Sequence, residues 1–190
     1  MTSPFDARPI VVALAGPNGA GKSTFYGAHL EAAGLRRVNA DELARELELG
    51  AYEAAALAER LRETLVEQRE SFVFETVFSD PEGAKVDFLL RASAAGYTVI
   101  LCFIGLDSPD LSEERVAMRV LQGGHDVPSE KLAARFPRTI ENLRRAIREL
   151  PHVLVFDNSD LGHPFRKIAE FERGAPVFLA RPKPRWLPWG

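Results

Sequence analysis

The stretch Gly16-Pro17-Asn18-Gly19-Ala20-Gly21-Lys22-Ser23-Thr24 has the composition of a phosphate-binding loop. It follows the pattern G-x-x-x-x-G-K-[ST]. Its glycines permit positive φ angles and leave room for backbone N–H groups to point at an anion. We expect Lys22 to reach the β- and γ-phosphates of a nucleotide and the Ser23 hydroxyl to take a Mg²⁺ position. The pattern therefore predicts that all nine residues bind a nucleotide, rather than forming a glycine-rich turn that binds nothing.

The elements on either side of this loop are the ones it needs. Residues 10–15 are uniformly apolar, which is typical of a strand buried on both faces of a parallel sheet. A helix is expected from Ser23 to about Ala33, where Gly34 can end it. Because a helix N-terminus carries partial positive charge, this arrangement favours anion binding.

Strands and helices alternate along the rest of the chain, which predicts an α/β fold with a mostly parallel sheet of five to six strands. The expected architecture is the three-layer α/β/α arrangement of P-loop proteins, with one domain over residues 1–190. A helical lid is expected at about 110–140 and an extended tail, packed on the surface, at 181–190. The further strands are expected at 38–39, 72–76, 97–104, 152–156 and 176–179. The further helices are expected at 41–49, 51–70, from Ser79 or Asp80 to about 96, at 110–121, from 128 and at 164–173.

Polar residues at the carboxyl ends of parallel strands are the candidates for chemistry, because ligands bind at that edge of such sheets. Asp41 follows the second expected strand and should face the phosphate loop. A carboxylate there can take a proton from a substrate hydroxyl that attacks the γ-phosphate. It can also serve as the N-cap of the helix that begins at Glu42, and the two roles are compatible.

Glu75 ends a strand of bulky apolar residues, where an unpaired charge would be costly. We expect it to form hydrogen bonds with a substrate hydroxyl or with an arginine. The strand at 97–104 is followed by Gly105, so the strand-end acid of motor ATPases is not evident there. Asp107 comes slightly later and could be a shifted version.

Four arginines flank a Gly-Gly pair in the expected lid: Arg115, Arg119, Arg135 and Arg138. Arginines brought in by lid closure can stabilise the charge that develops on a transferred phosphoryl group. The alternative is that they are solvated helix residues. His125, next to the Gly-Gly pair, could contact a phosphate or cap the loop.

The composition is that of an ordinary globular protein of 190 residues with a net charge of −3. No block of like charges appears, so neither nucleic acid nor an anionic membrane is an expected partner. No apolar run approaches the length of a membrane span, and the first residues do not have the pattern of a signal peptide. The single Cys102 cannot form an internal disulfide. We therefore expect a soluble cytoplasmic protein.

Taken together, the motifs resemble those of the zeta toxin family of P-loop kinases, in the family order. The matching segments are GPNGAGKST at 16–24, NAD at 39–41, FETVFS at 74–79, RVLQGGHDVP at 119–128, RFPRTIENL at 135–143 and FDNS at 156–159. The resemblance implies phosphorylation, dependent on ATP and Mg²⁺, of the 3′-hydroxyl of a UDP-amino sugar, typically UDP-N-acetylglucosamine.

The resemblance also implies roles for individual residues. Asp41 corresponds to the catalytic base, and Lys22 and Ser23 correspond to the phosphate and Mg²⁺ ligands. The residues expected to bind the acceptor are Asn39, Glu75, Thr76 and His125. The lid arginines expected to stabilise the charge of the γ-phosphate are Arg119, Arg135 and Arg138. Adenine is expected to lie near Asn158.

The chain departs from the best-known members of the family. It is shorter than the plasmid toxins, and its Gly-Gly-His-Asp-Val-Pro lid resembles a compact bacterial branch. It contains no obvious fused antitoxin, so an inhibitory partner would be a separate chain. Two other functions stay open: a kinase for another small acceptor (an antibiotic, a nucleotide or a dinucleotide), and a nucleotide-binding protein whose lid is ordered for a protein partner.

Overall fold

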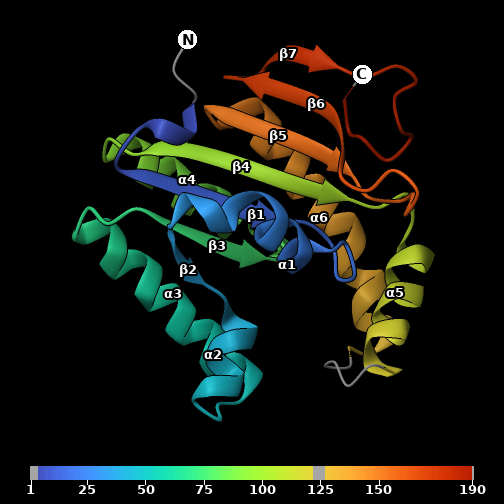
Figure 1. Cartoon of the computed structure of the whole chain (residues 1–190), viewed down its shortest axis with the longest axis horizontal. Helices are drawn as coiled ribbons and strands as arrows, with labels where there is room; N and C mark the ends of the chain where they lie inside the picture. Colours follow the sequence, from blue (N-terminus) through green and yellow to red (C-terminus); the bar gives the residue numbers. More distant parts are fainter. Residues whose placement is uncertain (1–3, 122–126, 190) are drawn as a thin grey trace.

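A seven-stranded sheet forms the centre of the protein (Figure 1). The computed structural model describes residues 4–121 and 127–189. The strand order is β2-β3-β1-β4-β5-β6-β7, in which the first five strands are parallel and the last two antiparallel. The strands are β1 (Ile10–Ala15), β2 (Arg36–Val38), β3 (Phe72–Thr76), β4 (Thr98–Gly105), β5 (His152–Asp157), β6 (Arg166–Glu172) and β7 (Ala175–Leu179).

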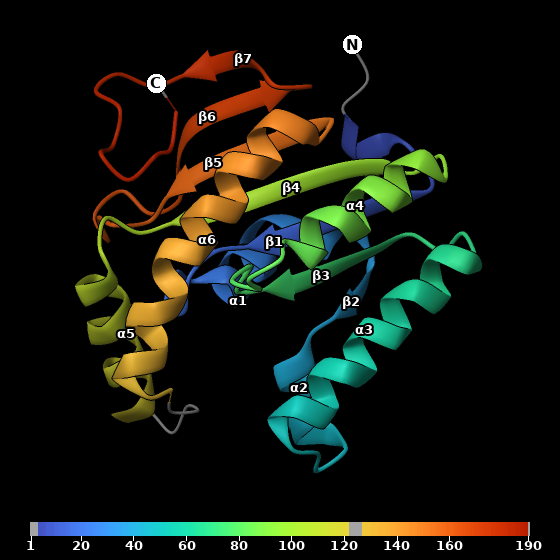
Figure 2. The same ribbon diagram turned by 180° about the vertical axis from the view of Figure 1, so that it is seen from behind.

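Helices cover both faces of the sheet, as the alternating pattern predicts. On one face lies α1 (Lys22–Phe25), which continues through a π-helical turn, η2 (Tyr26–Leu30), and a 3₁₀ turn, η3 (Glu31–Ala33). Figure 2 shows the other face, which is covered by three longer helices. These are α3 (Ala51–Glu67), α4 (Ala84–Ala94) and α6 (Ser129–Glu149); α2 (Ala40–Glu46) and α5 (Pro109–Leu121) extend beyond the carboxyl ends of the strands. The predicted three-layer α/β/α fold is confirmed.

The core explains why the parallel strands are apolar throughout. All six residues of β1 are fully buried, because helices pack on both sides of the strand. Alternate residues serve the two faces: Val11 and Ala13 belong to the cluster beneath α3, α4 and α6, while Val12 and Leu14 pack with Phe25 of α1. The central strand that leads into the phosphate loop is therefore held from both sides.

The expected helix at 164–173 was wrong, since residues 166–172 form strand β6. β6 pairs antiparallel with β5, and Ile168, Ala169 and Phe171 are buried against the core. Together with β7 it makes the sheet larger than predicted. The burial gained by adding a hairpin to the sheet edge outweighed a local pattern that suited a helix.

The predicted start of the fourth helix was also wrong. α4 begins at Ala84, after Gly83 in a left-handed conformation (φ 75°). Pro81 lies in a turn instead of the first helical turn. Asp80 still contributes, because its carboxylate accepts a hydrogen bond from the Ala84 N–H. The side chain of Asn142 holds the preceding turn by donating to the carbonyls of Phe78 and Asp80, both at 2.9 Å.

The tail after Ala180 has no regular structure but packs more deeply than a surface segment, with Trp186 and Leu187 buried. Among the described residues, no helix combines the length and apolar character needed to cross a membrane.

Tyr97 provides a test of how α3 is anchored. Its buried hydroxyl lies 3.1 Å from the carbonyl oxygen of Leu65 and 3.0 Å from that of Glu70, at the helix end where carbonyls lack helical partners. We expect Tyr97→Phe to lower the free energy of unfolding by about 1–2 kcal/mol in urea denaturation. Tyr52→Phe, at an exposed side chain, is the matched control and should change it by less than about 0.5 kcal/mol. Equal effects of the two substitutions would contradict this assignment.

Candidate functional site

The phosphate loop connects β1 to α1 with the backbone geometry predicted for it. Gly16, Gly19 and Gly21 have φ angles of 149°, 73° and 86°. A Cβ atom at Gly16 would lie 2.1 Å from the carbonyl oxygen of Ile104 on β4. The loop therefore needs glycine both for its conformation and for its approach to the neighbouring strand.

Lys22 lies across the inside of this loop. Its Nζ donates to the carbonyl oxygens of Gly16 at 2.9 Å and Pro17 at 3.0 Å. Burial lowers the pKa of Lys22 to about 8; the charges of Glu75 and Asp41 act to raise the pKa, and the charge of Arg119 acts to lower it. Lys22 is therefore mostly protonated at neutral pH. Its hydrogen-bond acceptors are two neutral carbonyl oxygens, which a phosphate could replace.

Two side chains from distant elements support the loop from behind. Ser112 on α5 donates from its hydroxyl to the carbonyl oxygen of Asn18 at 2.6 Å. Asn158, which is buried after β5, donates from Nδ2 to the carbonyl oxygen of Ala20 at 2.9 Å. Its Oδ1 accepts from the backbone N–H of Phe165 at 3.3 Å. The structure therefore places Asn158, predicted near adenine, as a brace of the phosphate loop.

Ser23 and Thr24 lie in the first turn of α1, and both are exposed. The Ser23 hydroxyl donates to Oε2 of Glu75 at 3.0 Å. Glu75 reaches Ser23 because β3 pairs directly with β1, with Leu14 opposite Glu75 and Ala15 opposite Thr76. A carboxylate next to the phosphate loop thus lies near the end of β3, whereas β4 ends in Gly105.

Glu75 is also paired with an arginine, one of the two partners expected for it. Arg37 on β2 donates from Nε to Oε1 of Glu75 at 3.0 Å and forms a second contact with the same oxygen through NH2. Arg37 also pairs with Glu42 at 2.5 Å and stacks on the ring of Tyr26 at 4.3 Å. Only 8% of the Glu75 side chain is exposed, so this pairing compensates a buried charge.

Asp41 does not cap α2. The cap is Asn39, whose Oδ1 accepts from the backbone N–H groups of Asp41 at 2.8 Å and Glu42 at 3.4 Å. Asn39 is buried and Asp41 is exposed, close enough to Lys22 for its charge to affect the lysine pKa. The capping alternative for Asp41 is therefore excluded, and its carboxylate stands at the mouth of the phosphate loop.

The four lid arginines occupy three different environments. Arg115 packs against Gly19 and donates to the carbonyl oxygen of Ser159 at 3.0 Å, so it belongs to the support of the loop. Arg119 is exposed on the next turn of α5, and its charge reaches Lys22. Arg135 and Arg138 lie on α6, which packs against α5. The Gly123-Gly124 pair and His125 lie outside the described residues.

Arg135 and Arg138 form part of the wall of a cleft of about 670 Å³. Its other wall is the end of β3 at Thr76 and the segment that follows. Thr76 pairs with Ala15, the last residue before the phosphate loop. The cleft is lined by Thr76, Val77, Phe78, Ser79, Asp80, Lys85, Glu130, Lys131, Ala134, Arg135 and Arg138. The cleft has four basic and two acidic residues in its lining, which favours an anionic occupant.

Two oxygen donors for a divalent cation lie side by side in this site. The Ser23 hydroxyl and the Glu75 carboxylate are adjacent, and such hard oxygen ligands suit Mg²⁺ when nucleotide phosphates supply the remainder. Within residues 4–121 and 127–189, no group of three or more His, Cys, Asp or Glu side chains is arranged to hold a metal by itself. The residues present thus fit a cation that arrives with a nucleotide.

Two functional contacts could not be expected from the residues alone. In the sequence alone, Arg37 is one of two consecutive arginines with no motif around it, and Ser112 is one of many polar residues on a helix. Neither carries a motif, and each acquires its role through a partner far away in sequence, Glu75 and Asn18 respectively.

The arrangement is similar to that of several solved structures. A chain of the AvrRxo1-ORF1:AvrRxo1-ORF2 complex superposes with a TM-score of 0.68 at 20% identity; the match covers 90% of this chain and 61% of that one. The PezAT chromosomal toxin-antitoxin system of Streptococcus pneumoniae gives 0.59 at 19% identity, covering 79% and 68%. A gluconokinase from Sinorhizobium meliloti gives 0.50 at 20% identity, covering 82% and 84%. These likenesses establish a shared fold.

No curated protein matches the sequence. The zeta toxin family model, in contrast, matches residues 1–163, which include the phosphate loop, Asp41, Glu75 and the lid arginines. With the loop geometry and the kinase-like sheet, this match shows that the chain belongs to the zeta toxin family of P-loop kinases.

Proposed function

We propose that this protein transfers the γ-phosphate of ATP to a hydroxyl of a UDP-amino sugar, with UDP-N-acetylglucosamine as the first candidate. The observation that carries the proposal is the basic cleft that opens beside the phosphate loop at Thr76. Lys85, Lys131 and Arg138 would face the diphosphate of such an acceptor, and a volume of about 670 Å³ can hold most of a sugar nucleotide.

The proposed reaction needs a base and a stabilised γ-phosphate. The acceptor hydroxyl oxygen forms a bond to the γ-phosphorus, the bond from this phosphorus to the bridging oxygen breaks, and ADP leaves. Asp41 takes the hydroxyl proton, a role suited to an exposed carboxylate at the mouth of the loop. Lys22, Arg119 and Arg135 would stabilise the negative charge.

Magnesium would be held by Ser23 with Glu75 beside it. When bound, Mg²⁺ neutralises charge on the nucleotide phosphates. Glu75 would then exchange its hydrogen bond from Ser23 for a place near the cation, while Arg37 keeps its carboxylate oriented. Thr76 and Asn39 flank this position and would contact the acceptor, and His125 is proposed to approach it from the lid.

A separate inhibitory protein is a second element of the proposal. One of the similar structures is the complex of AvrRxo1-ORF1 with AvrRxo1-ORF2, and another belongs to the PezAT toxin-antitoxin system. An antitoxin encoded as a separate chain would explain how a cell tolerates a kinase that consumes a cell-wall precursor.

The proposed reaction can be tested directly. Incubation of the protein with UDP-N-acetylglucosamine, ATP and Mg²⁺ should yield a phosphorylated sugar nucleotide, detected by mass spectrometry. Asp41→Asn should lower kcat about 10²- to 10⁴-fold with little change in ATP binding, because it removes the base. Lys22→Ala should abolish ATP binding. Glu46→Gln, an exposed carboxylate on the same helix, is the matched control and should retain full activity.

Absence of product with ATP binding intact would rule out this acceptor. A panel containing an antibiotic, nucleotides and dinucleotides would then be tested, and turnover of none of them would favour a nucleotide-binding interaction protein. Full turnover by Asp41→Asn would show that Asp41 is not the base.

The second prediction concerns pH. Lys22 has a pKa of about 8 in the ligand-free protein, and the phosphates of bound ATP raise the pKa again by adding negative charge. ATP binding at about pH 8.5 should therefore take up a fraction of a proton, and ATP affinity should fall as the pH rises through about 8. Calorimetry in two buffers of different ionisation enthalpy measures this uptake. It should disappear at about pH 6.5, and at every pH in Lys22→Arg, whose guanidinium does not titrate. Buffer-independent heats at pH 8.5 in the wild-type protein would contradict the assignment.

A further inference from the structure

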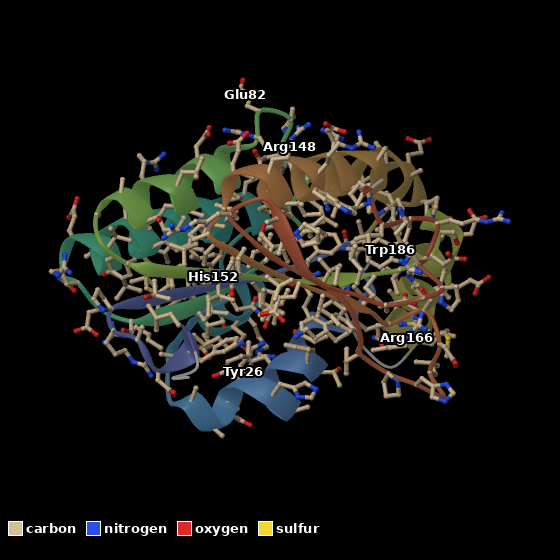
Figure 3. All side chains as sticks on the ribbon, turned by 90° about the horizontal axis from the view of Figure 1, so that it is seen from above. Tyr26, Glu82, Arg148, His152, Arg166 and Trp186 are labelled. Carbon is tan, nitrogen blue, oxygen red and sulfur yellow. The ribbon has the colours of Figure 1, made fainter. Side chains whose placement is uncertain are left out.

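The C-terminal tail lies outside the region that matches the zeta toxin family, which ends at residue 163. It nevertheless contributes two of the buried residues of the core, Trp186 and Leu187, with exposed fractions of 8% and 3%. Figure 3 shows Trp186 at the same end of the molecule as Arg166, which is paired with Asp157 at 3.3 Å. The tail therefore reaches the carboxyl ends of the central strands, where the candidate site lies.

Trp186 packs against the backbone of β4 at Gly105, where the absence of a side chain leaves room for the indole ring. A Cβ atom at Gly105 would lie 2.0 Å from the indole ring, so any other residue there would displace the ring. The ring centroid lies 6.1 Å from that of Phe103, and Nε1 donates to Oδ1 of Asp157 at 3.4 Å. Trp186 thus contacts two neighbouring strands, β4 by packing and β5 by a hydrogen bond.

The contacts continue from Asp157 to the loop itself. Oδ1 of Asp157 also accepts from the Ser159 hydroxyl at 2.6 Å and backbone N–H at 3.2 Å, which fixes the turn after β5. The backbone N–H of Asn158 donates to the carbonyl oxygen of Gly105 at 3.0 Å. From this fixed position the Asn158 side chain supports Ala20 of the phosphate loop.

We propose that Trp186 is a positioning residue for nucleotide binding. By holding Gly105 and Asp157 together, it keeps Asn158 where its amide supports the phosphate loop, and so sets the affinity for ATP. The inference rests on the nucleotide site of the proposed function but not on the identity of the acceptor.

The tail offers a matched control for this role. Trp189 lies three residues later and packs on Phe171 of β6, with ring centroids 4.8 Å apart. Both tryptophans thus cover the core from the same segment, but the contacts of Trp186 lead to the phosphate loop and the ring contact of Trp189 leads to the sheet edge. A tail that only covers the core would make the two substitutions equivalent.

The experiment compares Trp186→Phe with Trp189→Phe in the full-length chain, by calorimetric titration with ATP and by thermal unfolding without ligand. Loss of the indole N–H and of ring area at Trp186 should raise the Kd for ATP about two- to tenfold. Trp189→Phe should leave Kd within twofold of the wild-type value, and the two variants should have similar unfolding temperatures. Equal Kd values for the two variants would overturn the proposal, as would a weaker affinity that follows a lower unfolding temperature in both.

The same variants give a fluorescence test in which each tryptophan is observed alone. The chain contains two tryptophans, so Trp189→Phe leaves Trp186 as the only one. Saturable change of its emission with added ATP is expected, whereas Trp189 in Trp186→Phe should not respond. A silent Trp186 would overturn the proposal. Because no acceptor is present in either measurement, these results are independent of whether UDP-N-acetylglucosamine is the substrate.

Discussion

The close approach of the phosphate loop to β4 is the constraint on which the rest of the site depends. Gly16 leaves β1 in a backbone conformation that side chains rarely adopt and lies directly against the carbonyl of Ile104. A loop of this kind has few contacts of its own, and its N–H groups must stay directed inward for an anion. Its shape is therefore maintained by neighbours, Ser112 and Asn158, that hold its carbonyl groups from outside.

Electrostatic balance is the second requirement of this site. Lys22, Arg37 and Arg119 face Glu75 and Asp41 around a position that is partly removed from water. Burial lowers the pKa of Lys22, and the negative charges of Glu75 and Asp41 offset part of this decrease. Such a balance keeps a cation available for phosphate without leaving a buried charge unpaired in the absence of nucleotide.

The residues of the candidate site differ in how deeply they are buried. Gly16 at the start of the phosphate loop and the Glu75 side chain are buried at the ends of neighbouring strands, whereas Asp41 lies on α2 and Arg119 on α5, which extend beyond the sheet (Figure 1). The proposed base and one proposed lid cation thus approach the γ-phosphate position from opposite projecting parts. This arrangement leaves the basic cleft at Thr76 open for the acceptor of the proposed reaction.

Local sequence determined the phosphate loop, the alternation of strands and helices and the strand-end position of Glu75, because glycine spacing and hydrophobic periodicity act over short distances. The family resemblance also followed from the residues, and the match over residues 1–163 confirmed it. Tertiary structure decided which residue supports which. Residues 166–172 became a strand because the edge of β5 was available for pairing. Asp41 does not cap its helix because α2 begins earlier than expected, at Ala40, with Asn39 as the cap. The pairing of Arg37 with Glu75 and the packing of Trp186 on Gly105 join residues that are distant in sequence, and no local pattern encodes such contacts.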